Sequence, residues 1–585
     1  MDKNEIAVIL NEIGAILDLL GENRFKVIAY QNAARTLENL QEDLGQLIQQ
    51  ERLGEIRGFG PHIQEKVVAL YKTGKLRYYD ELKKSIPVGL IDLLRIPSLG
   101  PKKVRMLWTD LQVESVEDLK DRCEKGLVAK LGGFGEKTQE KILEGIGNLA
   151  TYRGYFFWIE AWNSAQPILE LLKKSPLVDK AEVGGSVRRK KEVIRDIDLL
   201  CSTEKPEAVM KLFIGSPGVQ KVINHGETKS SVMLGSGIQC DLRCVNKDQY
   251  PFALTYFTGS KEHNIVLRQR AIDRGLKLNE YGLFPVKGAP QKSLKCNEEE
   301  ELYRKLGLHY IEPEMREDTG EIAAAETGAL PHLVAWKDIR GTFHCHTTAS
   351  DGADTLEAMG EAARKLGWEY LGIADHSKSS VIANGLDEKR LLAQIKQIGE
   401  LNQRWKGQNF RLFAGSEVDV MINGSLDFPD EILAQLEYVV ASVHSGLGGD
   451  EAKNTARVIK AISNPCVTIL GHPTGRLLLS REGMKLDMNA VLEAAAETKT
   501  VVELNCTPSR MDLDWRHWKS ATRAGVLCAI NPDAHATAEL EQVRMGVGIA
   551  RKGWLTPATI LNTRKLAEVE KFLRAPKSKR ILGKP

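Results

Sequence analysis

Closely spaced histidine and acidic side chains recur along the C-terminal half of this chain of 585 residues. His344 and His346 stand two residues apart, and Asp533 and His535 repeat that spacing. Each pair lies beside an apolar run that predicts a β-strand, where side chains two residues apart point to the same side. The two members of each pair can therefore reach the same metal ion.

Single residues of the same kinds lie at or near the ends of other predicted strands: Asp351, Asp375, His376, Glu417, His444 and His472. Imidazole nitrogens mixed with carboxylate oxygens suit zinc, manganese or iron better than calcium. A lone histidine is more simply explained as a surface or capping residue, but that explanation does not account for the whole series. Because the set offers more ligands than one ion can use, it predicts a multinuclear metal site.

A second group of acidic residues lies further upstream. Asp196 and Asp198 are two residues apart on a predicted strand, and Asp241 lies on another. Three converging carboxylates bind hard divalent ions, which promote phosphoryl transfer by activating the attacking hydroxyl and neutralising the leaving pyrophosphate. An isolated Asp-x-Asp would be explained equally well by exposed acids at a strand end.

The segment before Asp196 strengthens this prediction. Gly184, Gly185 and Ser186 are followed by Arg188 and Arg189, which together supply a flexible turn, a hydroxyl and two guanidinium groups. Guanidinium groups form paired hydrogen bonds with phosphate oxygens. The combination therefore predicts a nucleotidyl-transfer site that binds a nucleoside triphosphate.

The elements that must position these residues change along the chain. Residues 155–315 mix predicted strands and helices, and residues 318–337, rich in Ala, Gly and Glu, are predicted to be a linker. From Ile339 onward helices alternate with predicted strands at 370–374, 438–443, 467–470, 501–505 and 527–530. This alternation predicts a β/α barrel, in which ligands gather at the C-terminal ends of the strands.

Residues 1–150 follow a helical pattern that three glycine turns interrupt. Each turn resembles a helix-hairpin-helix motif, whose backbone N–H groups contact a DNA phosphate without reading base sequence. Glycine also ends helices routinely, so one such turn would carry little weight alone. The residues predicted to contact DNA in this segment are Gly58, Gly60, Lys66, Gly100, Lys102, Gly133 and Gly135.

The composition favours a soluble chain of several domains, with 42% hydrophobic and 27% charged residues. Lys and Arg cluster in the N-terminal half, which favours a polyanionic partner although the net charge is only +3. The nine cysteines form no CxxC pair, and neither a signal peptide nor an uncharged apolar stretch of about 20 residues is present. These observations predict a cytoplasmic protein with no membrane partner.

Several independent motifs closely resemble those of the family X DNA polymerases. They are Gly184-Gly185-Ser186-Val187-Arg188-Arg189, the acids Asp196, Asp198 and Asp241, and Tyr256-Phe257-Thr258-Gly259-Ser260 followed by Asn264 and Arg268. This resemblance covers residues 1–317. The C-terminal residues resemble the PHP (polymerase and histidinol phosphatase) domain, so the whole chain is similar to a bacterial family X polymerase fused to a PHP domain.

The resemblance implies a multidomain fold. N-terminal all-α helix-hairpin-helix domains would precede an α+β nucleotidyltransferase palm and thumb, and a C-terminal distorted β/α barrel would form the PHP domain. The implied boundaries are 1–85 for a lyase-type helical domain, 86–152 for the fingers, 153–255 for the palm, 256–317 for the thumb, 318–337 for the linker and 338–575 for the PHP domain.

The resemblance also implies residue roles. Asp196, Asp198 and Asp241 would hold Mg²⁺, and Asp241 would help to activate the primer 3′ hydroxyl. Arg268 would contact the template strand. The residues implied to bind the incoming nucleotide are Gly185, Ser186, Arg189, Tyr256, Phe257, Gly259 and Asn264.

Three lysines mark points of comparison with relatives. Lys66 falls where Schiff-base-forming relatives carry a nucleophilic lysine, but His62 replaces a supporting lysine, so Lys66 is either the nucleophile of a 5′-deoxyribose phosphate lyase or a phosphate contact. Lys190 stands where several relatives have glycine, and Lys261 where a vertebrate relative has an acid. Because of these two changes the nucleotide affinity and the fidelity stay undetermined, whereas the nucleotidyl-transfer chemistry is expected to be retained.

In the PHP domain the pattern retains all nine metal ligands: His344, His346, Asp351, His376, Glu417, His444, His472, Asp533 and His535. The resemblance implies up to three Mn²⁺ or Zn²⁺ ions and a 3′→5′ exonuclease, with 3′ phosphatase or abasic-site endonuclease activity as further options. Four more residues near strand ends have a structural role, support the ligands or contact DNA: Asp419, Glu503, Asn505 and Arg510.

The predicted partners are gapped or primer-template DNA and dNTPs, bound by a monomer. Two alternatives stay open. The PHP domain could act as a small-molecule phosphatase, or the protein could be a DNA-binding scaffold with vestigial polymerase chemistry.

Overall fold

The structure is a computed structural model that describes residues 1–581 except positions 2, 39, 41, 43, 57, 95, 97, 98 and 287–291. The chain forms two compact units, Met1–Arg153 with Leu479–Arg481, and Gly154–Leu478 with Glu482–Pro585. None of the described helices is long and apolar enough to cross a membrane.

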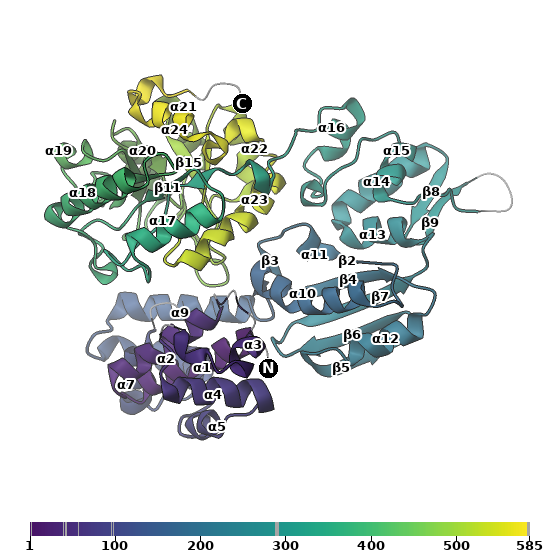
Figure 1. The fold of residues 1–585 in the computed structure, drawn as a ribbon, viewed down its shortest axis with the longest axis horizontal. Helices are drawn as coiled ribbons and strands as arrows, with labels where there is room; N and C mark the ends of the chain where they lie inside the picture. Colours follow the sequence, from purple (N-terminus) through teal and green to yellow (C-terminus); the bar gives the residue numbers. More distant parts are fainter. Residues whose placement is uncertain are drawn as a thin grey trace. The chain divides into compact units, whose positions relative to one another are not determined.

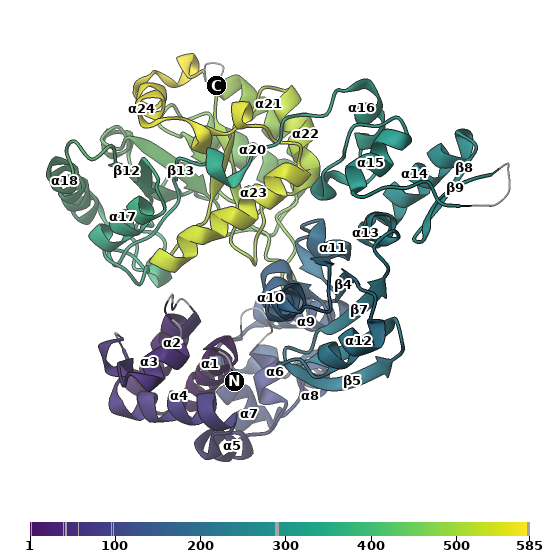
Figure 2. The same cartoon turned by 45° about the vertical axis from the view of Figure 1, so that its right-hand side comes forward.

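The first unit is helical, as its sequence periodicity predicts (Figures 1 and 2). Its apolar side chains form two cores, one around Leu10 and Val67 and the other around Leu90, Val104 and Leu119. The helices are α1 (Lys3–Leu19), α2 (Arg24–Glu38), α3 (Leu44–Gln49), α4 (Pro61–Thr73), α5 (Arg77–Lys84), α6 (Leu90–Leu93), α7 (Pro101–Leu111), α8 (Val116–Glu124) and α9 (Glu136–Thr151).

The second unit begins with a five-stranded sheet in the order β2-β4-β7-β6-β5. Its strands are β2 (Lys180–Val183), β4 (Asp196–Ser202), β5 (Val219–His225), β6 (Lys229–Leu234) and β7 (Gln239–Val245). Strands β4 and β7 are parallel, whereas the other neighbours are antiparallel. This is the α+β palm that the sequence predicts.

Helices cover both faces of the palm sheet. Alternate residues of β4, such as Ile197 and Leu199, pack with α10 (Trp158–Lys174) and α12 (Pro206–Ile214) in one core. Leu200 points the other way and packs with Leu254 of α13 (Tyr250–Thr258). Because side chains alternate along a strand, Asp198 shares the α13 face with Leu200.

The thumb follows the palm and is formed by α14 (Lys261–Asp273), β8 (Leu276–Asn279), β9 (Gly282–Pro285) and α15 (Glu299–Lys305). The segment predicted to be a linker contains α16 (Glu321–Thr327) and packs against its neighbours. Glu321 is fully buried and its carboxylate lies 2.7 Å from His263 Nδ1, while the Val334 amide donates to Leu555 O. The predicted domain boundaries themselves stay predictions.

The C-terminal part is a sheet of seven parallel strands in chain order. They are β10 (Gly341–Thr342), β11 (Tyr370–Ile373), β12 (Arg411–Asp419), β13 (Tyr438–Ser442), β14 (Ile469–Leu470), β15 (Val501–Asn505) and β16 (Cys528–Asn531). A parallel bridge between Cys345 and Ala534 links the ends that follow β10 and β16, so the sheet nearly closes into a barrel. The predicted fold class is confirmed.

An outer layer of helices surrounds the barrel (Figure 1). Its interior is apolar. Phe343, Tyr370, Phe413 and Tyr438 meet inside it, and the alternate residues of the strands face the helices. The helices are α17 (Leu356–Lys365), α18 (Glu388–Arg404), α19 (Asp430–Leu433), α20 (Glu451–Ile462), α21 (Met488–Thr498), α22 (Trp515–Arg523), α23 (Val543–Lys552) and α24 (Leu566–Arg574).

Candidate active sites

The predicted metal ligands gather at the C-terminal ends of the barrel strands. His344 and His346 follow β10, His376 follows β11, and Glu417 lies on β12. In the same way, three further strands supply the next ligands: His444 follows β13, His472 follows β14, and Asp533 and His535 follow β16. Asp351 lies in the loop between β10 and α17. The fold therefore brings together residues that the sequence spreads over nearly two hundred positions.

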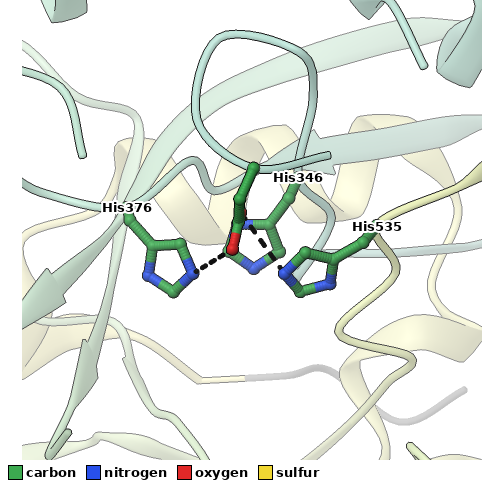
Figure 3. Close-up of side chains that lie close together, drawn as sticks. His346, His376 and His535 are labelled. Atoms are coloured by element: carbon green, nitrogen blue, oxygen red, sulfur yellow. Dashed lines mark ion pairs between the residues drawn. The ribbon is translucent and has the colours of Figure 1, made fainter. Parts of the chain in front are cut away.

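Three overlapping groups have ligand atoms within 4.8 Å of one another. They are His346, Asp351, His376 and His535; His344, His346 and Asp533; and His376, Glu417 and His444. Figure 3 shows the imidazoles of His346, His376 and His535 converging from three different segments. Asp351 lies between two of them, with oxygens 3.4 Å from His535 Nε2 and 3.7 Å from His376 Nε2.

Glu417 occupies the centre of this site and is 1% exposed. Its Oε1 lies 2.9 Å from His472 Nε2 and 3.2 Å from His444 Nε2. Its Oε2 lies 2.8 Å from His376 Nδ1. His472 belongs to none of the three groups but reaches the site through this contact, and Glu417 offers both of its carboxylate oxygens to the surrounding histidines.

The residues present fit a set of metal ions. Buried side-chain atoms without a hydrogen-bond partner among the described residues include His344 Nε2, His346 Nδ1 and His472 Nδ1. Burying such nitrogens unpaired is costly, so a site that gathers several of them suits a bound cation. Burial opposes charge on Glu417, but His444, His344 and His376 hold its pKa well below the usual range.

Four residues that the sequence left open support the ligands. Glu503 accepts a hydrogen bond from His344 Nδ1 at 2.7 Å, and Asp419 binds His444 Nδ1. Asn505 Nδ2 donates to Asp533 at 3.0 Å, and Arg510 Nε lies 3.5 Å from the same carboxylate. Partners of this kind fix the orientation of a ligand toward the ion.

Asp375, which the sequence placed among the candidate acids, has a different position. Its carboxylate accepts hydrogen bonds from the Thr347 amide at 2.7 Å, from the Ser350 hydroxyl and from Gln394 Nε2 at 2.6 Å. Asp375 therefore holds the loop that follows His346, and these carboxylate contacts involve none of the predicted metal ligands.

The palm places its acids on neighbouring strands. Asp198 of β4 and Asp241 of β7 are direct partners in the parallel register, and Asp196 lies two residues before Asp198. Gly185 approaches them closely: a Cβ there would lie 2.2 Å from Asp198 Oδ2. Only glycine fits this turn, because it also has a φ of +55°.

Burial and the neighbouring carboxylates together affect the pKa of one palm acid. Burial, with added repulsion from Asp196 and Asp241, raises the pKa of Asp198 to about 6. Lys229 Nζ lies 3.0 Å from Asp241 Oδ2 and offsets part of this charge. Among the described residues, every group of three or more possible ligands whose ligand atoms lie within 4.8 Å of one another belongs to the barrel. The three palm acids are therefore less closely gathered than the barrel ligands. Their all-oxygen donor set fits hard divalent ions.

We expect Asp198→Asn to stabilise the metal-free protein at pH 8 by about 1 kcal/mol, after discounting the shift for solvent screening. The folded-state pKa of Asp198 is raised from 3.8 to about 6. Wild-type stability from this group is therefore present at low pH and is lost as the pH rises through 6. Chemical denaturation in EDTA at pH 4 and pH 8 measures this, and an equal effect at both pH values would contradict it.

Phe257, one of the residues implied to bind nucleotide, lines a cavity together with Asp198 and Asp241. Arg189 Nε lies 2.9 Å from Glu317 Oε1, and its Nη1 donates to Thr258 O in the Tyr-Phe-Thr-Gly-Ser segment. Asn264 Nδ2 donates to Tyr256 O at 2.7 Å. A small cavity is lined by Phe252, Thr255, Tyr256, Asn264, Arg268, Leu278 and Asn279. Their roles toward nucleotide and DNA stay predictions.

The three glycine turns each precede a helix of the first unit. Helices α4, α7 and α9 begin directly after Gly60, Gly100 and Gly135, and none of these three helices has a side-chain cap. No described atom lies within 4 Å of a Cβ built at any of these glycines. Pro61 and Pro101 open α4 and α7 and have no N–H, so the groups that an anion such as a DNA phosphate could meet begin at His62, Lys102 and Glu136.

Lys66 lies on α4 against aromatic rings. Its Nζ is 5.0 Å from the ring of Tyr78 and 5.8 Å from that of Tyr30, and donates to His62 O. Burial lowers the pKa of Lys66, helped by Lys26 and opposed by Glu65. This direction favours the neutral amine that a nucleophile requires.

Comparisons with known proteins agree with this arrangement. Residues 253–317 match the DNA polymerase beta thumb, and residues 342–505 match the PHP domain. Residues 1–76 match the helix-hairpin-helix domain and residues 90–148 the SAM-like helix-hairpin-helix tandem. The chain is 37% identical over 576 residues to "DNA polymerase/3'-5' exonuclease PolX" of Bacillus subtilis, covering 98% of this chain and 100% of that protein.

The chain belongs to the bacterial family X DNA polymerases. The resemblance seen in the motifs is thus confirmed over almost the full length of this family X polymerase. Membership implies divalent metal ions, with DNA and nucleotides as substrates.

This family X polymerase also has shorter relatives. Proteins named "Probable phosphatase" match it in Thermoanaerobacter sp., with 28% identity over 247 residues, and in Caldicellulosiruptor bescii, with 27% identity over 229 residues. These matches cover 95% and 89% of the relatives but only 40% and 37% of this chain. The likeness therefore extends over less than half of this chain.

Proposed function

We propose that this family X polymerase fills short gaps in DNA at the palm and trims DNA 3′ ends at the barrel. The observation that carries the proposal is the convergence of the nine barrel ligands, Glu417 among them, in a chain that also pairs Asp198 with Asp241. A protein that kept only a DNA-binding function would have no need for either acid-rich site.

At the palm, the residues bind and orient the primer and the nucleotide. Mg²⁺ ions held by Asp196, Asp198 and Asp241 would lower the pKa of the primer 3′ hydroxyl and neutralise charge on the phosphates. Ser186 and Arg189 would bind the triphosphate, while Tyr256, Phe257 and Gly259 would lie along the sugar. Asn264 would contact the base edge, and Arg268 the template strand.

At the barrel, the gathered ligands would act on a phosphodiester. Mn²⁺ or Zn²⁺ ions held there, up to three, would activate water and stabilise negative charge on the phosphate oxygens. Glu503 and Asp419 fix the imidazoles of His344 and His444. Arg510, which is mostly buried beside Asp533, would offer its guanidinium to the substrate phosphate.

Extension and resection of a labelled primer on gapped DNA, with Mg²⁺ or Mn²⁺, test the proposal. We expect one-nucleotide products with dNTPs and shortened products without them. The likeness to proteins named "Probable phosphatase" favours a second candidate, a small-molecule phosphatase at the barrel. Rapid hydrolysis of a small phosphate monoester without any shortening of DNA would support that candidate instead.

We also propose that the protein acts as a cytoplasmic monomer. The nine cysteines are all free, which suits a reducing compartment. A single species of monomer mass in light scattering would agree, whereas a stable dimer would not.

A lyase reaction at Lys66 can be tested separately. We expect borohydride to trap the wild-type protein on DNA bearing a 5′-deoxyribose phosphate, and Lys66→Ala to remove at least about nine tenths of the adduct, since the covalent bond needs this amine. Lys72→Ala, an exposed lysine on the same helix, should leave the adduct unchanged. If the wild-type protein forms no adduct, Lys66 serves only to contact phosphate.

A further inference from the structure

A lysine on helix α23 of the barrel contacts the palm. The side chain of Lys552 is 0% exposed, and its Nζ donates to the backbone oxygen of Arg189 at 3.1 Å and to the carboxylate of Glu317. A fully buried ammonium is costly unless it is paired and hydrogen-bonded. Lys552 satisfies this requirement entirely outside its own domain.

Glu317 connects that lysine to the nucleotide site. Its Oε1 accepts both from Lys552 Nζ and from Arg189 Nε, the latter at 2.9 Å. Burial opposes charge on Glu317, but Lys552 and Arg189 lower its pKa. One carboxylate oxygen is therefore shared between a barrel cation and the arginine implied to bind triphosphate.

The residue after Arg189 makes a second contact with the same helix. Lys190 has a φ of 55°, which explains why glycine suits this position. Its ammonium lies 3.8 Å from the ring centre of Trp158, and a Cβ at Gly548 of α23 would lie 3.0 Å from Lys190 Cγ. The glycine of α23 thus leaves room for the stem of this lysine.

We propose that helix α23 positions Arg189 for the triphosphate through Lys552 and Glu317, so that Lys552 is a positioning residue for nucleotide addition. This inference rests on the proposed role of Arg189. The PHP domain then supports synthesis as well as trimming.

The charges explain why the loss of Lys552 is expected to weaken triphosphate binding. While Lys552 balances Glu317, the carboxylate holds only one edge of the Arg189 guanidinium, and Arg189 Nη2 donates to no acceptor among the described residues. Without Lys552, Glu317 would keep its charge paired to Arg189 alone. The stronger pair would draw the guanidinium from the triphosphate.

Steady-state kinetics on gapped DNA test this idea. We expect Lys552→Met to raise KM for dNTP about tenfold with little change in kcat, because ground-state and transition-state binding of the triphosphate both weaken. Lys552→Met combined with Glu317→Gln removes both charges and should restore KM to within about threefold of wild type. Resection of a 3′ end should be unchanged in both variants.

Arg551→Met is the matched control. Arg551 precedes Lys552 on α23 and pairs with Glu314 at 2.9 Å, but it does not touch Arg189. The KM of the Arg551→Met variant for dNTP should equal that of the wild-type protein. Should Lys552→Met not fold, Lys552→Gln carries the same expectation.

The inference would be overturned if Lys552→Met left the KM for dNTP unchanged, or if Arg551→Met raised that KM as much as Lys552→Met does. In either case, primer extension by the wild-type protein would still uphold the proposed function. A double variant no better than the single one would overturn it too. Absence of extension by the wild-type protein would overturn both.

Discussion

Asp196→Ala combined with Asp198→Ala will abolish primer extension and leave 3′ resection intact. Both carboxylates belong to the palm, and Asp198 sits opposite Asp241 in the sheet register. Removing two of three ligands eliminates the site for hard divalent ions, so we expect a loss of about a thousandfold or more. The barrel ligands lie on other strands and are untouched.

Gel analysis of a labelled primer on gapped DNA, with and without dNTPs, measures both reactions. Asp248→Ala is a suitable control because Asp248 is an exposed palm acid outside the sheet strands. Thermal unfolding shows whether the variants fold. Extension at more than a tenth of the wild-type rate would contradict the assignment of these acids as metal ligands.

His344→Ala will have the opposite effect, losing resection and keeping extension. His344 is fully buried, with Nε2 lying 3.4 Å from Glu417 and 3.6 Å from Asp533. Its removal deletes a ligand and leaves Glu503 without the imidazole that it orients. Loss of a supporting partner alone costs about 10-fold to 100-fold in a metal site, so we expect loss of a ligand to exceed that range.

Two controls accompany this variant. His332→Ala removes an exposed histidine and should retain both reactions. Treatment of wild type with EDTA should stop resection, and Mn²⁺ should restore it in wild type but not in His344→Ala. Undiminished resection by His344→Ala would show that another site cuts the DNA.

The sequence predicted which side chains gather at the barrel rim because spacing and side-chain chemistry are local properties. A period of two places His344 beside His346, and the strand ends of a barrel meet at one rim. The same period explains why Asp375 is different. It adjoins His376, and neighbouring residues on extended backbone point to opposite sides.

Other features depended on contacts that no local pattern encodes. The burial of Glu321 comes from pairing with His263, so the segment 318–337 could not be recognised as packed structure from its composition. The bond between Lys552 and Glu317 joins residues 235 positions apart. Likewise, the sequence places Asp198 and Asp241 on separate strands but does not show that they lie opposite each other in the sheet.

The central claim is that one chain carries two independent active sites. The most direct test follows one labelled gapped DNA with the wild-type protein, the Asp196→Ala and Asp198→Ala double variant, His344→Ala, and the protein combining all three changes. We predict that the wild-type protein extends and resects the DNA, whereas the Asp196→Ala and Asp198→Ala double variant only resects it. We also predict that His344→Ala only extends the DNA and that the protein with all three changes does neither. Loss of both reactions in either of the first two variants, with the fold intact, would contradict the claim.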